Sequence, residues 1–134
     1  MKNIKKLFLL IFISGFFISG CSKSDDTITG PGGDTNRNPN APSSPTPSNG
    51  QVNLTGNVTV TWQCTDPDAS DTLRYDVKIG STANPTTTVA TNVLNRAADI
   101  GVAGPDVVVY WRVIAKDNHG GVTNGPVWSY RTAP

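Results

Sequence analysis

The feature that most constrains the fold is the alternation of apolar and polar side chains along four segments. These segments are 57–64, 72–79, 107–116 and 126–132. Successive side chains of a strand point to opposite faces of a sheet, so a period of two predicts half-buried β-strands. Three weaker strands are expected, at 51–54, 86–90 and 96–102. About seven short strands, separated by turns, predict an all-β, immunoglobulin-like sandwich.

The composition favours the same fold class and argues against several functions. All ten acidic residues are Asp, and the chain contains 13 Gly and ten Pro, which is a poor composition for a helical bundle. With no Glu and with His119 as the single histidine, most acid–base and metal-hydrolase sites cannot be assembled. We therefore expect a protein that is not an enzyme. A net charge of +1 also gives no reason to expect binding to nucleic acid.

The N-terminus has the pattern of a secretory signal. Lys2, Lys5 and Lys6 precede an apolar run over 7–18, which is too short to cross a bilayer comfortably. The run ends in Ile18-Ser19-Gly20-Cys21, which resembles the lipobox of bacterial lipoproteins. This resemblance implies a signal peptide over 1–20 and acylation of Cys21, for example by palmitate. The alternative is an uncleaved N-terminal membrane helix.

The segment after Cys21 is rich in Ser, Pro, Gly and Asn and has few large apolar side chains. Such a composition predicts a disordered linker over 21–41, followed by a folded domain over 42–134. The acidic pair Asp25-Asp26 resembles the surface-export signal of Bacteroidetes lipoproteins. The expected location is the outer membrane, with a lipid anchor; the domain faces either the cell surface or the periplasm.

The domain also resembles the fibronectin type III family. The resemblance is carried by Pro42, Pro45, Trp62, Cys64, Asp66-Pro67-Asp68, Tyr75-Asp76-Val77, Tyr110-Trp111-Arg112-Val113 and Gly125–Thr132. It implies a seven-stranded antiparallel sandwich with the B–C and F–G loops at one end. Val109 occupies a position where the family usually has a Tyr, so one stabilising hydroxyl contact of the family is missing here. The fold alone says little about function.

Acidic side chains cluster in the two loops expected at that end. The candidate ligands for a calcium ion are Asp66, Asp68, Asp71, Asp117 and Asn118. Calcium binds about six to eight oxygen atoms, and these side chains with backbone carbonyls approach that number. An EF-hand is excluded because the chain has no Glu. The alternative is that Asp and Asn only initiate turns by bonding their own backbone. No other cofactor is expected.

One face of the sheet is a candidate surface for a glycan or a partner protein. The side chains expected to project from it are Tyr110, Arg112, Ile114, Arg74 and Lys78. Tyr can stack on a sugar, and Arg supplies planar hydrogen bonds. The alternative is an ordinary solvated sheet face with ion pairs such as Asp76–Arg112.

The remaining candidates are minor. His119 is expected in an exposed turn, and Cys64 is expected to be buried and inert. Thr27 and Thr72 follow Asp and precede an apolar residue, a pattern that resembles the O-glycosylation acceptor of Bacteroidetes. The leading hypothesis is a non-catalytic envelope lipoprotein that displays one binding or scaffold module. The alternative is a carbohydrate-recognition module.

Overall fold

A computed structural model describes residues 28–29 and 35–134, and these residues form ten strands. The strands are β1 (Ile28–Thr29), β2 (Thr35–Asn36), β3 (Ser43–Thr46), β4 (Gln51–Leu54), β5 (Thr59–Gln63), β6 (Arg74–Gly80), β7 (Thr87–Val93), β8 (Ala97–Asp99), β9 (Val108–Lys116) and β10 (Val122–Thr132). The described residues contain no helix, so none is available that is long and apolar enough to cross a membrane. The expected all-β class is confirmed.

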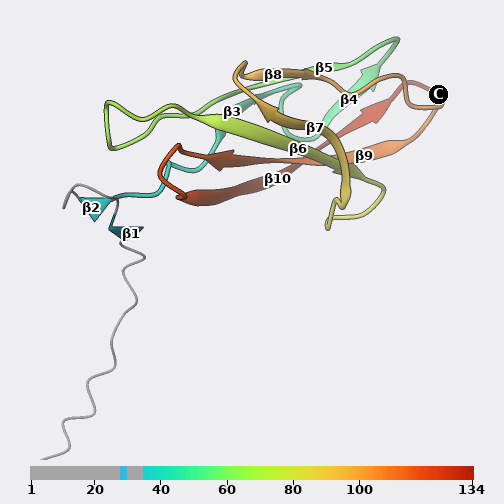
Figure 1. Cartoon of the computed structure of the whole chain (residues 1–134). Helices are drawn as coiled ribbons and strands as arrows, with labels where there is room; N and C mark the ends of the chain where they lie inside the picture. The colour runs from blue at the N-terminus through green and yellow to red at the C-terminus, as the bar shows by residue number, and fades with distance from the viewer. Residues whose placement is uncertain (1–27, 30–34) are drawn as a thin grey trace, which may run out of the picture.

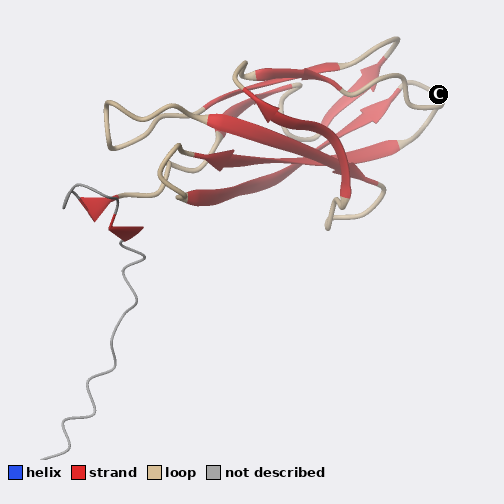
Figure 2. Cartoon of the chain, viewed as in Figure 1, coloured by secondary structure: helices blue, strands red, loops and turns tan. Residues whose placement is uncertain are grey.

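Two sheets lie face to face, as Figures 1 and 2 show. One has three strands in the order β3-β5-β8, and the other has five in the order β4-β10-β9-β6-β7. β1 and β2 form a separate short pair next to the sandwich. Within the two sheets every neighbouring pair is antiparallel except β4 and β10, which run parallel.

The strand count differs from the expected seven, because eight strands form the two sheets. The strand that the sequence did not predict is β3, which has no apolar alternation and contains Pro45. Pro lacks a backbone N–H, and it is tolerated here because β3 lies at the edge of its sheet. The pairing of β3 with β5 is irregular between Ser43 and Thr46, the stretch that contains Pro45.

The core between the sheets contains the side chains that the alternation assigned to the inner faces. Trp62 and Trp111 are almost completely buried. Trp62 meets Tyr75 edge-on with ring centroids 5.3 Å apart, and Trp111 packs against Trp128 at 4.7 Å. Such aromatic pairs add to the stabilisation from buried apolar area. Cys64 is buried and its thiol is free, as expected.

The N-terminal boundary of the ordered part differs from the expected residue 42. Asn36 donates a hydrogen bond to Asp117, Arg37 to Asp68, and Asn40 to Thr65. The polar residues that predicted a linker over 21–41 include, at 36–40, donors of hydrogen bonds to acceptors in the loops of the domain. This segment joins the sandwich at the end opposite the C-terminus (Figure 1). The signal peptide and Cys21 lie outside the described residues.

Candidate functional site

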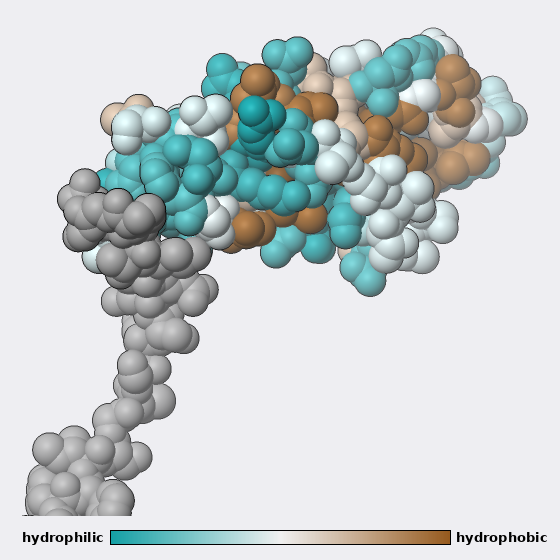
Figure 3. Space-filling model, in the orientation of Figure 1, coloured by the Kyte–Doolittle hydropathy of each residue, from teal (hydrophilic) through white to brown (hydrophobic). Residues whose placement is uncertain are grey.

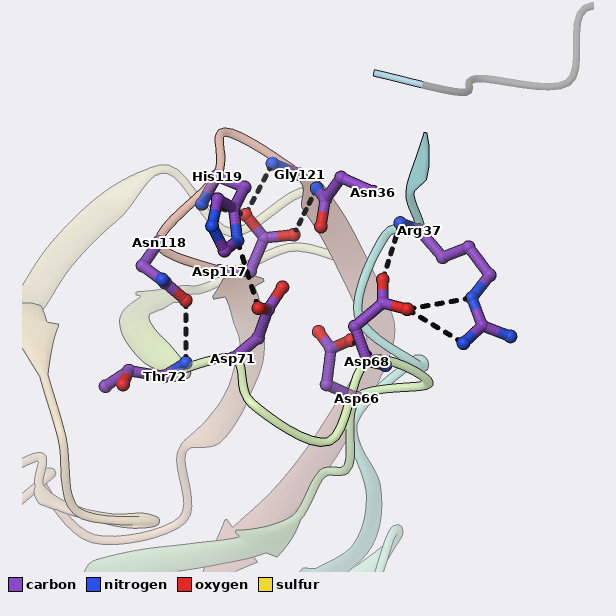
Figure 4. A network of polar contacts seen from close by, with 10 residues as sticks. All are labelled: Asn36, Arg37, Asp66, Asp68, Asp71, Thr72, Asp117, Asn118, His119 and Gly121. Carbon is purple, nitrogen blue, oxygen red and sulfur yellow. Dashed lines mark hydrogen bonds and ion pairs between the residues drawn. The ribbon is translucent and has the colours of Figure 1, made fainter. Parts of the chain in front are cut away.

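The loop between β5 and β6 and the turn between β9 and β10 meet at the end where the N-terminal segment joins (Figure 4). β6 begins beside the end of β9, with Arg74 paired to Lys116 in register. The residues before β6 and after β9 are therefore brought together by the antiparallel pairing. We call the three carboxylates that meet here, Asp66, Asp71 and Asp117, the acidic pole. Figure 3 shows hydrophilic residues gathered at this end and more hydrophobic ones toward the C-terminal end of the face in view.

The three carboxylates of the acidic pole are close enough to share one ion. One oxygen of each lies within 4.8 Å of the others. The side chain of Asp71 is only 2% exposed, and its Oδ1 lies 3.0 Å from Nδ1 of His119. The second oxygen, Oδ2, is buried without a hydrogen-bond partner, and so is Oδ2 of Asp66. A buried carboxylate oxygen with no partner is costly, so both atoms call for an explanation.

Asp117 is the best-satisfied member of the acidic pole. Its Oδ1 accepts backbone hydrogen bonds from His119 at 2.8 Å and Gly121 at 2.7 Å, and its Oδ2 accepts one from Asn36 Nδ2 at 2.9 Å. Burial alone would raise the pKa of Asp117, but these hydrogen bonds outweigh burial and lower it. Asp117 is therefore ionised at neutral pH.

Asp66 is affected in the opposite direction. Its Oδ1 accepts a hydrogen bond from the backbone N–H of Asp68 at 2.8 Å. Burial raises the pKa of Asp66, and the negative charges of Asp71, Asp117 and Asp68 raise it further, against the lowering effect of that hydrogen bond. The carboxylates of this loop and turn thus repel one another.

The other two predicted ligands have partners elsewhere. Asp68 accepts three hydrogen bonds from Arg37: from the backbone N–H at 2.7 Å, from Nε at 3.0 Å and from Nη2 at 2.8 Å. These bonds lower the pKa of Asp68. Oδ1 of Asn118 accepts the backbone N–H of Thr72 at 2.7 Å and points away from the acidic pole (Figure 4). The structure therefore brings together three of the five predicted ligands.

Sequence reasoning missed the partners of the acidic pole. Asn36 and Arg37 lie in the expected linker, and His119 was expected only to be exposed. Asn36 is separated from Asp117 by 81 positions in the chain, so no local pattern connects them. The only available signal was the run of Asn and Arg over 36–40, immediately before the expected domain.

The second predicted site lies on the outer face of the five-stranded sheet. Tyr110, Arg112 and Ile114 are half-buried on β9, with alternate residues facing the core. Lys78 of β6 is in register with Arg112. Arg74 is exposed and donates to the backbone carbonyl of Asn92 at 3.2 Å. The predicted set is thus arranged along two adjacent strands.

The expected ion pair between Asp76 and Arg112 is not present. Asp76 pairs instead with Lys116, and it also accepts the backbone N–H of Asn92 at 2.9 Å. Nε of Arg112 is buried without a hydrogen-bond partner. The Nε of Arg112 thus lies below the surface of this face and has no partner among the described residues.

Of the two predicted glycosylation positions, only Thr72 lies among the described residues. Thr72 is exposed, at the end of the loop that precedes β6. Thr27 lies outside the described residues.

No family model matches this chain, and no curated protein matches it. The ligands that the protein could bind are therefore inferred from the side chains of the acidic pole and of the outer sheet face. The acidic pole offers carboxylate oxygens, which bind hard cations. The outer sheet face offers an aromatic ring beside cationic donors, which bind planar and hydroxyl-rich ligands.

Proposed function

We propose that this protein is a non-catalytic lipoprotein of the outer membrane that displays one fibronectin type III-like domain as a binding or scaffold module. The lipobox-like Ile18-Ser19-Gly20-Cys21 supports the anchor. Two facing sheets of short strands and the tryptophan-rich core support the family resemblance. The buried Cys64 supports the absence of thiol catalysis.

The observation that carries this proposal is the end-on attachment of the domain. The segment that leads back toward Cys21 joins the sandwich at one end, and the C-terminus lies at the other (Figure 1). Both outer sheet faces and the C-terminal end therefore project from an anchored N-terminus. Two acyl chains hold a protein stably at a membrane, whereas one does so only marginally.

The anchor is tested by growing bacteria that express the full chain with alkyne-tagged palmitate. We expect the wild type to be labelled and to fractionate with the outer membrane, and Cys21→Ser to lose the label. Cys64→Ser is the matched control and should keep it, because this thiol is buried in the sandwich. Label retained in Cys21→Ser, or a mature N-terminus elsewhere than residue 21, would overturn the proposal.

A second candidate function, carbohydrate recognition, is favoured by the outer face of β9. There the half-buried ring of Tyr110 lies two residues from Arg112, whose Nε has no partner in the protein. A sugar stacked on the ring would lie beside the cationic guanidinium of Arg112, although it could reach the buried Nε only if the side chain shifted. Lys78, in register with Arg112, adds a second cationic donor.

The test is a glycan array probed with the full chain and with Tyr110→Ala. We expect binding by the wild type and at least a tenfold loss in the variant. Val108→Ala, a change at another exposed position of the same strand, is the control and should bind normally. Absent binding, or equal binding by wild type and Tyr110→Ala, would overturn this second candidate.

A further inference from the structure

The acidic pole has two buried oxygen atoms that the protein leaves without partners. Oδ2 of Asp71 and Oδ2 of Asp66 have no hydrogen-bond donor, although the side chain of Asp71 is only 2% exposed. In Figure 4 the two carboxylates and that of Asp117 point toward a common space between the loop and the turn. Buried polar atoms are nearly always satisfied, so these atoms indicate a missing partner that is a donor or a cation.

The charge of the acidic pole favours a cation over a neutral donor. Three carboxylates lie within 4.8 Å of one another. Among the described residues no Lys or Arg forms an ion pair with any of the three, and the one basic side chain in contact with them is His119, beside Asp71. Arg37 is nearby, but its guanidinium is bound to Asp68 and to the carbonyl of Pro67. The negative charge of the three carboxylates is therefore not balanced by any Lys or Arg of the described residues.

The N-terminal segment places one amide oxygen, Oδ1 of Asn38, beside Asp117. A Cβ atom at Gly121 would collide with Oδ2 of Asp117 and would lie 2.9 Å from Oδ1 of Asn38. The Asn38 amide oxygen and the Asp117 carboxylate thus flank one point, which is open only because residue 121 is glycine. Asn36 reaches Asp117 from the same segment. Two different parts of the domain and the N-terminal segment therefore converge here.

We propose that the acidic pole binds a calcium ion through Asp66, Asp71 and Asp117, and that the bound ion fastens the N-terminal segment at Asn36–Asn38 to the sandwich. The unpartnered oxygens of Asp66 and Asp71 are the first ligands. Oδ2 of Asp117 and Oδ1 of Asn38 extend the set, and water completes it. The ion thereby fixes the direction in which the domain leaves its N-terminal segment.

Calcium fits these ligands better than other common cations. The set consists of oxygen atoms from carboxylates and an amide, whereas zinc prefers thiolate and imidazole ligands. The nearby imidazole of His119 contacts Oδ1 of Asp71 and is not among the ligand atoms that lie within 4.8 Å of one another. The carboxylates come from a loop and a turn, which hold their ligands less rigidly than regular secondary structure. Calcium accepts such irregular sites with about six to eight oxygens, whereas magnesium requires near-octahedral geometry and keeps its water.

The first test measures thermal unfolding of the full chain in detergent with about 5 mM calcium chloride or with EGTA. This concentration exceeds the dissociation constants typical of extracellular calcium modules, about 10⁻⁴–10⁻³ M. We expect calcium to raise the Tm of the wild type by about 5 °C or more. Asp71→Asn and Asp66→Asn should each abolish most of this rise, because an amide oxygen carries no charge. Asp106→Asn, the same change at an exposed carboxylate that pairs with Arg131, should leave the rise intact.

The results of this test decide whether the acidic pole binds an ion and whether that ion is calcium. No rise in the wild type, or an equal rise in Asp71→Asn and Asp66→Asn, would overturn the site. A rise in magnesium as large as in calcium would overturn the choice of ion. Isothermal titration of the same variants with calcium reports their affinity directly. The Tm of each variant in EGTA shows whether it is folded.

The second test follows hydrogen exchange over residues 35–41. We expect calcium to slow exchange of this segment in the wild type and in Asp106→Asn, but not in Asp71→Asn. Unchanged exchange despite a raised Tm would overturn the fastening of the segment. The Cys21→Ser variant should respond to calcium like the wild type, so failure here is independent of failure of the lipid anchor.

Discussion

Asp76 shows how single residues are stabilised on the outer face of the five-stranded sheet. Its side chain is 14% exposed, and it pairs with Lys116 and accepts the backbone N–H of Asn92. Burial alone would raise the pKa of Asp76, but these two contacts outweigh it and lower the pKa. The ionised form is therefore favoured in the folded state relative to the unfolded chain.

This residue predicts a pH dependence of stability. A carboxyl whose pKa is lower in the folded state stabilises the protein at pH values above its pKa in the unfolded chain, which is about 4. This stabilisation is lost as the pH falls through the pKa of the carboxyl in the folded state. We expect Asp76→Asn to lower the free energy of unfolding by about 1 kcal/mol at pH 7, and the difference from the wild type to shrink below pH 4. Urea unfolding of both proteins at pH 7, 5 and 3 measures it. A difference that stays constant down to pH 3 would contradict this assignment.

Among the elements, β10 depends on a glycine to accommodate the start of the domain. Its pairing with β9 is irregular between Asn124 and Val127, and Gly125 within this stretch is buried. A Cβ atom at Gly125 would lie 2.7 Å from the backbone oxygen of Val113 and 3.3 Å from Pro42. The irregular stretch thus allows the buried Pro42 to pack against β10.

Gly125→Ala should therefore be strongly destabilising. The nearest obstacle is a backbone atom of the central strand β9, which cannot move aside easily. We expect a loss of about 1–3 kcal/mol in the free energy of unfolding, the usual cost of overpacking. Gly104→Ala is the matched control, since its Cβ would make only an ordinary 3.8 Å contact with Val107. Equal stability of the two variants in urea would show that β9 and β10 separate more readily than we infer.

At the scale of the whole molecule, the N-terminal segment and the sandwich form one ordered unit. Arg37 and Asp68 join them through a backbone hydrogen bond and a two-pronged guanidinium contact. The guanidinium side chain remains largely exposed, so each contact alone contributes little. The orientation of the sandwich relative to the segment over 35–41 therefore depends on several weak contacts acting together.

Asp68→Asn should loosen this junction without unfolding the sandwich. Loss of the charged acceptor should increase the rate of tryptic cleavage after Arg37 by about two- to tenfold, because cleavage requires the segment to detach. Asp106→Asn, which removes a carboxylate at a distance from the segment, should leave the rate unchanged. A rate in Asp68→Asn equal to the wild type would show that other contacts hold the segment.

Features of this protein that depend on neighbouring residues were predictable, whereas features that depend on contacts between distant residues were not. The alternation over 57–64 and 107–116 predicted two central strands and placed Trp62 and Trp111 in the core, because side-chain period is a property of neighbouring residues. It missed β3, whose strand exists only because the edge of β5 offers hydrogen-bond partners to a segment with no period of its own. It also left open which sheet each strand joins, since pairing depends on distant residues.

The candidate site divides in the same way. The local pattern was enough to predict carboxylates in two loops, because Asp and Asn favour turns between strands. The pairing of distant strands places Asp66, Asp71 and Asp117 next to one another, whereas Asp68 is hydrogen-bonded to Arg37 and Asn118 to Thr72. A hydrogen bond requires its two atoms to lie about 3 Å apart, and the chain brings these residues so close only after β6 and β9 have paired.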